Sequence, residues 1–414
     1  QVVAEAPRID PNGFRDLSYD STGLGAFLDA TEPGSTMKVF LTSAALDAGT
    51  LEVDDVIDCS GGSYRVPGKI IRDHRDYGIL DPAQVLWHSS NVGSVQIAQD
   101  LGPEEHYHAL RRFGFGTSTG SGFPHESSGL LRGWQNWKPV DHATIAFGQG
   151  ISVTMVQLAA ATAALANGGE WLTPRLIKAR RSSGGRWKET PVERVRQAVS
   201  PETARAVLDM MRGVVSSEGT GRLAGLRDVS VAGKTGTAQK LDPGTGAYAK
   251  NRYLAWFIGA VPADDPEFVI VVVLDEPKGL AHGGGDVAAP LFAKVATTHL
   301  ARVGIVTAPK AEPRLRVELA QKAAPPKQHE PAPRAVARAA SPEPPATRLG
   351  DRILLPDLRG LSRDEVTEFA DSHSLELRSE GRGRAFEQVP APGTILAGPR
   401  ARILVRFRMG SLEG

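Results

Sequence analysis

Two residues near the start of the chain, Ser35 and Lys38, have the types and the spacing of a serine nucleophile and its base. Pro33 and Gly34 cannot sit comfortably inside a helix, and good helix formers follow, so Ser35 is predicted to lie at a helix N-terminus. Side chains three residues apart on a helix are neighbours, so the Lys38 amine is expected to reach the Ser35 hydroxyl. A partly desolvated lysine can be neutral enough to take the serine proton, and the helix N-terminus favours the oxyanion formed on a carbonyl.

The Ser-x-x-Lys spacing is a weak signal alone, because it recurs on surface helices where the serine is a cap and the lysine is solvated. Two later segments strengthen it. Ser89 and Asn91 place a hydroxyl and an amide two residues apart, and the run from Lys234 to Thr237 places a second lysine in a strand of glycine and threonine. Taken alone, that run would be interpreted as an edge strand with a protective lysine.

In this order, the three elements resemble the Ser-x-x-Lys, Ser-x-Asn and Lys-Thr-Gly motifs of penicillin-binding proteins and serine β-lactamases. Four flanking stretches resemble those of class B penicillin-binding proteins, which are monofunctional peptidoglycan D,D-transpeptidases: Asp10–Asn12, Glu32–Gly34, Gly148–Thr154 and Trp256–Gly259. The resemblance covers residues 1–304, the predicted transpeptidase domain. It implies the α+β penicillin-binding transpeptidase fold, which is serine β-lactamase-like and combines an antiparallel sheet with a helical subdomain.

The resemblance also implies roles for the first two motifs. Ser35 would attack the penultimate D-Ala carbonyl of a muropeptide stem, and Lys38 would be the general base. Ser89 would relay the proton, and Asn91 would orient the substrate amide. Which residue takes the first proton is left open at this point.

For the third motif, the resemblance implies that Lys234 supplies positive charge and that Thr235 and Thr237 hold the terminal carboxylate of the donor. Gly236 would remove a side chain where an extended peptide lies along the strand. The backbone amides of Ser35 and Thr237 would form the oxyanion hole. The implied partners are stem peptides that end in D-Ala-D-Ala, β-lactams as covalent inhibitors, and other envelope synthesis proteins. No cofactor, metal or nucleic acid is expected.

Two alternatives remain open. A serine β-lactamase or a β-lactam-sensing receptor would carry the same motifs, but a lactamase needs a further base, and the loop Phe113–Gly129 offers no clear deacylating glutamate. This glycine-rich loop is expected to border the cleft. A non-catalytic envelope scaffold with a vestigial site is the second alternative, and the presence of all the motif residues argues against it.

The composition is that of an ordinary globular protein, with 414 residues, 41% hydrophobic and 23% charged. The net charge of +1 gives no overall field that would favour nucleic acid. The single cysteine, Cys59, excludes an intrachain disulfide. His106 and His108 lack a ligand set with known metal spacing and are predicted to lie on a solvated helix face.

No apolar run is long enough for a transmembrane helix. The beginning of the sequence, Gln1–Pro7, is interpreted as the second half of a hairpin, so we expect a truncated ectodomain. The resemblance implies that the intact protein carries a membrane anchor and lies on the extracytoplasmic face of the plasma membrane in the bacterial cell envelope.

Helix boundaries can be predicted from capping residues. Asp81 precedes a proline and is a plausible N-cap, and Thr154 with Gln157 fits a capping box in front of an alanine-rich helix that must be buried. A further helix is predicted from Pro201 to Val214.

The second half of the motif-bearing region changes to strand periodicity. Residues 234–239, 252–260 and 268–274 are predicted to form three strands, and their short links make them antiparallel neighbours. A closing helix over residues 288–300 follows, which favours an α+β arrangement over a doubly wound one.

The C-terminal part of the chain changes composition twice. Residues 305–350 are rich in proline and alanine and are predicted to be an extended linker. Residues 351–409 resemble a PASTA domain, a small α+β module, and the turn at residues 390–394 is the specific part of that resemblance. Within it, Ser362 and Glu365 are predicted to form a capping box.

Overall fold

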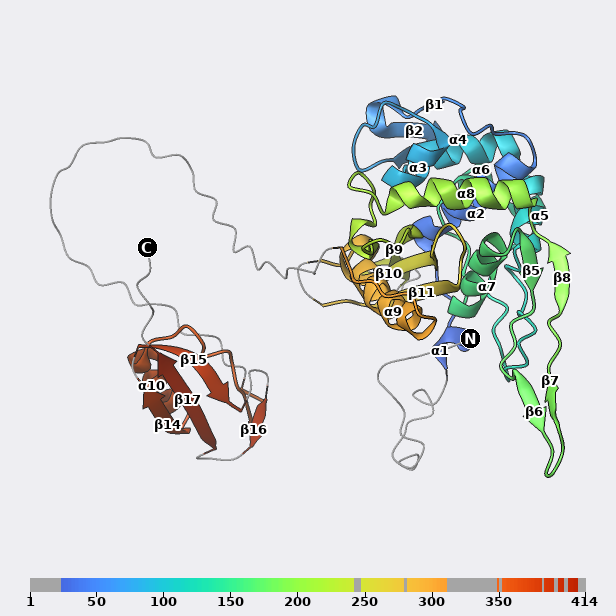
Figure 1. The fold of residues 1–414 in the computed structure, drawn as a ribbon. Helices are drawn as coiled ribbons and strands as arrows, with labels where there is room; N and C mark the ends of the chain where they lie inside the picture. The colour runs from blue at the N-terminus through green and yellow to red at the C-terminus, as the bar shows by residue number, and fades with distance from the viewer. Residues whose placement is uncertain are drawn as a thin grey trace, which may run out of the picture. The chain divides into compact units, whose positions relative to one another are not determined.

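The structure is a computed structural model that describes residues 24–241, 247–278, 281–310, 348–349, 352–381, 383–390, 394–397 and 401–408. The chain forms two compact units, Gln1–Glu318 and Leu319–Gly414 (Figure 1). The predicted hairpin strand Gln1–Pro7, the flank Asp10–Asn12 and most of the predicted linker lie outside the described residues.

Nine α-helices of the first unit are described. They are α1 (Gly25–Leu28), α2 (Met37–Asp47), α3 (Pro82–His88), α4 (Asn91–Leu101), α5 (Pro103–Arg112), α6 (Pro139–Ile145), α7 (Met155–Ala166), α8 (Pro201–Val214) and α9 (Ala289–Arg302). The predicted capping box of α7 is present, because the Thr154 hydroxyl accepts from Gln157 N and the Gln157 side chain accepts from Thr154 N. Asp81 caps α3 in the same way with Gln84. These local predictions are confirmed.

A three-stranded antiparallel sheet lies at the centre of the first unit, with its strands in the order β11-β10-β9. The strands are β9 (Ala232–Leu241), β10 (Tyr248–Val261) and β11 (Phe268–Asp275), and Gly236 pairs with Trp256. The structure therefore confirms the three predicted strands and their antiparallel order. β9, which carries the Lys-Thr-Gly motif, is at an edge of this sheet.

Both faces of the central strand β10 are buried, which explains its nearly continuous hydrophobic run. Leu254, Trp256 and Ile258 face a core that they share with α2, α7 and α8. Phe257 and Val261 face the opposite core, beneath α9. The alternation follows from the two-residue period of a strand, and it gives one sheet with helices on both faces (Figure 1). The α+β fold is thus as expected.

Short strands complete the first unit. They pair as β1 (Ile57–Asp58) with β4 (Ile79–Leu80), β2 (Ser63–Val66) with β3 (Lys69–Arg72), β5 (Glu170–Leu172) with β8 (Arg194–Gln197), and β6 (Ala179–Arg181) with β7 (Trp187–Glu189). In the described ranges, no helix combines the length and the apolar composition needed to cross a bilayer.

The first unit continues past the boundary predicted at Gly304. Ile305 packs against the core under α9, and Pro309 forms an antiparallel bridge with Leu226. The amide of Lys310 also donates to Gly225 O at 2.8 Å. The predicted boundary therefore lies too early, because this short segment is held by backbone pairing that its composition does not signal.

The second unit contains one helix and two small sheets. The helix is α10 (Arg363–Ser372), one sheet has β14 (Glu376–Gly381), β17 (Arg402–Arg408) and β15 (Arg384–Val389), and the other has β12 (Arg348–Leu349), β13 (Arg352–Leu354) and β16 (Ile395–Ala397). The capping box predicted at Ser362 and Glu365 is present. The second unit has a hydrophobic core of its own, which includes Val366, Phe369 and Val405.

The prediction for the two histidines of α5 is right for His108, which is exposed, and wrong for His106, which is 1% exposed. His106 lies one turn before Ala109 and Leu110, so it belongs to the apolar face of the helix. Its ring lies 5.3 Å from the ring of His142. Burial and the neighbouring His142 lower the pKa of His106 to about 3, and burial lowers the pKa of His142 to about 4.

These two histidines should make the first unit sensitive to acid. Both stay neutral in the folded state, whereas an unfolded histidine gains a proton near pH 6.5, so stability is complete above pH 6.5 and falls as the pH drops toward 4. At pH 5 the loss should be about 2 kcal/mol per histidine. Urea unfolding of His106→Phe at pH 7.5 and pH 5 should show a smaller pH effect than wild type. The exposed control His108→Phe should keep the wild-type effect, and equal pH effects in all three proteins would contradict the assignment.

Candidate active site

A pocket of about 660 Å³ opens beside the edge strand β9. Its lining includes Ser35, Ser89, Asn91, Thr235, Gly236 and Thr237 from the three motifs, together with His74, Tyr77, Phe147, Gln149, Thr220 and residues 281–286. The structure therefore brings together segments that are far apart in the sequence.

The loop Phe113–Gly129 does not line this pocket, contrary to the prediction. Phe113 and Phe115 are buried, and their rings pack on Phe40 at centroid distances of 5.0 and 5.1 Å. The glycines indicate an exposed loop beside the cleft. The first residues of the loop, however, pack into the hydrophobic core through the two phenylalanines.

Ser35 lies in a 3₁₀ turn, Gly34–Thr36, that leads directly into α2 at Met37. The predicted position at a helix N-terminus is thus observed. The turn packs backbone to backbone against a second loop, because Gly34 N donates to Gly148 O at 3.2 Å. A Cβ atom on Gly148 would lie 2.1 Å from Gly34 O, so only glycine allows this approach. Gly148 therefore helps to fix the serine turn.

Lys38 is fully buried, and its Nζ donates to Ser89 O at 2.5 Å, Ser89 Oγ at 3.3 Å and Asn91 Oδ1 at 2.8 Å. Among the described residues, its hydrogen bonds go to this turn rather than to Ser35, in contrast to the expected direct contact. Burial lowers the pKa of Lys38 to about 7, although the negative charge of Asp73 opposes the shift. The amine can thus exist in its neutral, basic form near pH 7.

The Ser89 hydroxyl lies between two buried amines. Lys234 Nζ donates to Ser89 Oγ at 2.9 Å and to Thr235 O at 3.0 Å. Burial lowers the pKa of Lys234 well below its usual value, and the charge of Lys38 lowers it further. Ser89 itself has a φ of +58°, which is rare for a residue other than glycine. Its position between the two lysines suits a group that passes a proton.

Asp73 holds the Ser-x-Asn turn in place, and sequence reasoning missed this residue. Its carboxylate accepts from Asn91 N at 2.5 Å, Val92 N at 3.1 Å and Ser90 Oγ at 2.5 Å. It therefore caps α4 and fixes the backbone from which Ser89 and Asn91 project. No spacing rule links Asp73 to a turn so far along the chain, so only its carboxylate type could have signalled a role.

Asp73→Asn should loosen this turn without removing any motif residue. The amide cannot accept all three hydrogen bonds, so unfolding free energy should fall by about 1.5–3 kcal/mol, the range for a hydrogen bond to a charged group. Penicillin labelling should also slow, because the Lys38 partners shift. Urea unfolding and labelling kinetics measure both effects. Asp76→Asn is the control, since among the described residues that carboxylate accepts only from the nearby Gly78 N. An equal loss in both variants would refute the anchoring role.

The hydroxyls of the two motif threonines are both engaged. Thr235 Oγ1 lies 2.8 Å from Thr220 Oγ1, and Thr237 Oγ1 accepts from Gly284 N at 3.1 Å. Neither Thr220 nor Gly284 was singled out from the sequence. The glycine run at residues 283–285 was the available signal, because it allows a segment to approach β9 closely.

Gly236 has a structural reason that differs from the predicted one. A Cβ atom at this position would lie 2.8 Å from Pro33 O and 2.9 Å from Thr36 Cγ2. The missing side chain therefore makes room for the serine turn, which lies directly against β9. Gly236 still lines the pocket.

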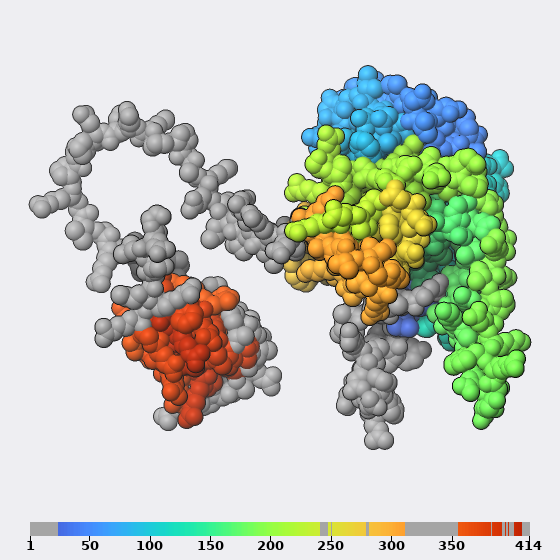
Figure 2. Space-filling model, viewed as in Figure 1, coloured from blue at the N-terminus to red at the C-terminus, as the bar shows by residue number. Residues whose placement is uncertain are grey.

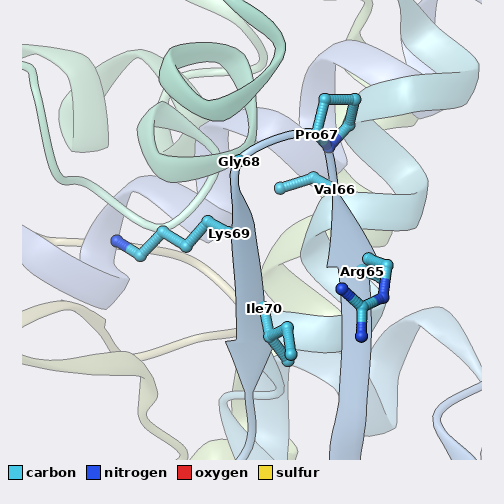
Figure 3. Close-up of a pocket in the computed structure, with 6 residues that line it drawn as sticks. All are labelled: Arg65, Val66, Pro67, Gly68, Lys69 and Ile70. Atoms are coloured by element: carbon cyan, nitrogen blue, oxygen red, sulfur yellow. The ribbon is translucent and has the colours of Figure 1, made fainter.

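Glu32 links the serine turn to its surroundings. It accepts from Gly150 N at 2.8 Å and from Tyr248 OH at 3.0 Å. Burial raises the pKa of Glu32, and the positive charge of Lys69 opposes this shift. Lys69 is at the tip of the β2–β3 hairpin, where Figure 3 shows it pointing away from Arg65 beside a separate hollow of about 510 Å³.

The arrangement of fold and motifs is that of the transpeptidase and serine β-lactamase class. A family model described as the penicillin binding protein transpeptidase domain matches residues 1–297, and the chain belongs to this family.

Two curated relatives and two solved structures show the extent of the similarity. Penicillin-binding protein PbpB of Mycolicibacterium smegmatis is 38% identical over 296 residues, 69% of this chain and 46% of the relative. The probable peptidoglycan D,D-transpeptidase PenA of Neisseria meningitidis serogroup A is 34% identical over 312 residues, which are 73% of this chain and 50% of the relative. This chain therefore spans about half the length of these relatives.

Penicillin-binding protein 3 of Mycobacterium tuberculosis, complexed with ampicillin, matches with a TM-score of 0.64 and 35% identity over 70% of this chain and 66% of that one. The apo transpeptidase domain of penicillin-binding protein 3 from Burkholderia pseudomallei matches with a TM-score of 0.61 and 32% identity. The match covers 70% of this chain and 84% of that one.

Proposed function

We propose that this protein is a peptidoglycan D,D-transpeptidase that forms cell-wall cross-links through a serine acyl-enzyme and that β-lactams inhibit covalently. The observation that carries the proposal is the Ser89 hydroxyl held between the buried amines of Lys38 and Lys234, in the pocket that Ser35 lines. Such an arrangement can take a proton from a serine and return it to a leaving amine.

In the proposed reaction, Ser35 Oγ attacks the carbonyl between the last two D-Ala residues of a stem peptide. Its proton passes to Lys38, and the amides of Ser35 and Thr237 stabilise the oxyanion. When the C–N bond breaks, Ser89 gives its proton to the nitrogen of the departing D-Ala and takes up the proton held by Lys38, to which it is hydrogen-bonded. An acceptor amine then attacks the ester carbonyl and gives up a proton to the neutral Lys38. The ester C–O bond breaks, the cross-link forms, and Lys38 returns a proton to Ser35 Oγ.

The other motif residues have supporting roles in the proposal. Lys234 polarises Ser89, Asn91 orients the donor amide, and Thr235 and Thr237 bind the terminal carboxylate. Both threonines line the pocket on the edge strand β9, which supports this assignment because an extended donor can lie along that edge. Gly236 keeps the strand and the serine turn in contact.

The geometry does not favour a β-lactamase. Glu126, the carboxylate of the loop Phe113–Gly129, accepts from Thr119 N at 2.8 Å and from Ser121 Oγ at 2.8 Å, and it does not line the pocket. It is thus engaged within its own loop and is not positioned to activate water for hydrolysis of the acyl-enzyme.

The wider setting follows from the same proposal. The protein would act in the bacterial envelope on the extracytoplasmic face of the plasma membrane, as part of a longer membrane-anchored chain, beside other envelope synthesis proteins. Residues 351–409 would be a PASTA module, joined to the catalytic unit through a proline- and alanine-rich linker. The capped helix α10 on a small sheet with its own core supports that module.

The proposal is tested with a peptide donor ending in D-Ala-D-Ala and a D-amino acid as acceptor. We expect D-Ala release together with a product that contains the acceptor, and both should stop after pre-incubation with penicillin. Repeated turnover of penicillin instead would identify a β-lactamase. No D-Ala release and no penicillin adduct would identify a non-catalytic scaffold.

A further inference from the structure

A positively charged ribbon, residues 173–197, projects from the first unit, and the catalytic site does not use it. It contains eight Lys and Arg residues against two Glu residues, a net charge of +6, whereas the entire chain has +1. Figures 1 and 2 show the ribbon, which ends in β6 and β7, extending beyond the helical layers. Positive charge is therefore concentrated on one projecting element.

The two faces of the ribbon differ in chemistry. Arg180 pairs with Lys188, and Arg181 pairs with Trp187 in the adjacent register position. Since cross-strand partners share a face and neighbours alternate, Arg180 and Lys188 point to one side. Lys178 extends that side, because its carbonyl accepts from Thr190 N at 2.8 Å and continues the ladder. One face is thus a row of cations.

The cations of this face are available to a partner. Lys178, Arg180, Arg186 and Lys188 are all exposed, and none forms an ion pair with any described residue. On the other side, Trp187 is 65% exposed. Exposed tryptophan and arginine side chains without ion pairs are of the kind enriched at binding surfaces.

The base of the ribbon is fixed to the catalytic unit. Trp171 is 3% exposed, and the Arg196 guanidinium lies over its ring at 4.3 Å. Arg196 Nε also donates to Arg112 O at 2.6 Å. The ribbon is therefore anchored at its root and can hold a bound polymer in a defined relation to the catalytic pocket.

We propose that this ribbon is an additional binding site for a peptidoglycan strand outside the catalytic pocket, an inference that rests on the proposed function. The row of cations on one face would bind the free carboxylates of the peptide stems. Trp187 on the other face would stack on a sugar ring where the strand passes around the edge of the two-stranded ribbon. A membrane surface fits less well. The side with Trp187 also carries Arg181 and Glu189, so it offers too little continuous apolar area for insertion between lipids.

The experiment is co-sedimentation of the full chain, blocked beforehand with penicillin, with insoluble peptidoglycan. The double variant Arg180→Glu with Lys188→Glu should raise the apparent Kd by about tenfold at low salt, because two cations facing a polyanion are reversed. The control reverses the same charge elsewhere, as Arg205→Glu with Lys294→Glu on the exposed faces of α8 and α9, and should bind like wild type. Trp187→Ala should weaken binding at high salt as well, since ring stacking is not screened.

Penicillin labelling separates this inference from the proposed function. The ribbon variants should be labelled at the wild-type rate; if wild type is not labelled, the transpeptidase proposal fails whatever the sedimentation shows. Wild-type labelling with undiminished peptidoglycan binding by the ribbon variants would overturn the ribbon site alone. If the ribbon variants lose binding to phosphatidylglycerol vesicles but keep wild-type binding to peptidoglycan, the ribbon is a lipid-binding surface. That result would also overturn the proposed peptidoglycan site.

Discussion

Ser35→Ala should form no covalent adduct with penicillin, whereas the wild-type chain should gain one penicilloyl group per molecule. The lactam carbonyl takes the place of the donor carbonyl, and Ser35 is the motif serine held at the N-terminus of α2, where backbone amides can stabilise the oxyanion. Intact-mass analysis after incubation with excess penicillin measures the result directly, and peptide mapping of the wild type should place the adduct on Ser35.

Ser89→Ala is the matched control for this experiment. Ser89 lies in the same pocket, but its hydroxyl is bound by the two lysines and has the position of a relay. This variant should still form the Ser35 adduct, only more slowly. An adduct on Ser35→Ala together with none on Ser89→Ala would exchange the two roles and would refute the mechanism proposed above.

The sequence was sufficient for the elements with strong local signals. Capping boxes at Thr154 and Ser362 fix helix starts within a few residues, and short links determine the antiparallel order of β9, β10 and β11. The three motifs could be placed in one pocket because a known family arranges them so. Where the signal lies within a few neighbouring residues, prediction from the sequence succeeds.

The missed features depend on contacts between distant segments. Asp73 acts on Asn91 through backbone amides, and Thr220 acts on Thr235 through a hydroxyl pair, but neither contact leaves a periodic trace in the sequence. The burial of His106 has a different, local cause: a histidine is usually solvated, but the three-residue spacing from His106 to Ala109 puts it on the apolar face of α5.

The role predicted for Gly236 is incomplete because its packing also depends on contacts between distant segments. A glycine indicates a close approach but does not say which segment approaches. Here the serine turn lies against Gly236, while Gly284 lies against Gly236 and Thr237, and Gly285 lies near Thr235. The packing around β9 thus explains why position 236 of the motif has no side chain.

Lys38→Ala should be acylated by penicillin about 10²–10⁴ times more slowly than wild type, the usual value of a positioned base. In wild type, the base is the unprotonated amine, and burial lowers the pKa of Lys38 to about 7. The acylation rate should therefore be low at pH 5.5, rise through pH 7 and level off above pH 8. Stopped-flow or gel-based labelling with fluorescent penicillin across this range gives the profile.

Lys38→Arg distinguishes a base from a structural cation. The guanidinium keeps a positive charge that can bind Ser89 and Asn91, but it stays protonated at any pH where the protein is folded. If Lys38 takes the serine proton, Lys38→Arg should be as slow as Lys38→Ala and should lose the rise through pH 7. If Lys38→Arg instead acylates at the wild-type rate, the charge alone suffices, and the base must be sought elsewhere, first at Lys234, which also bonds to Ser89.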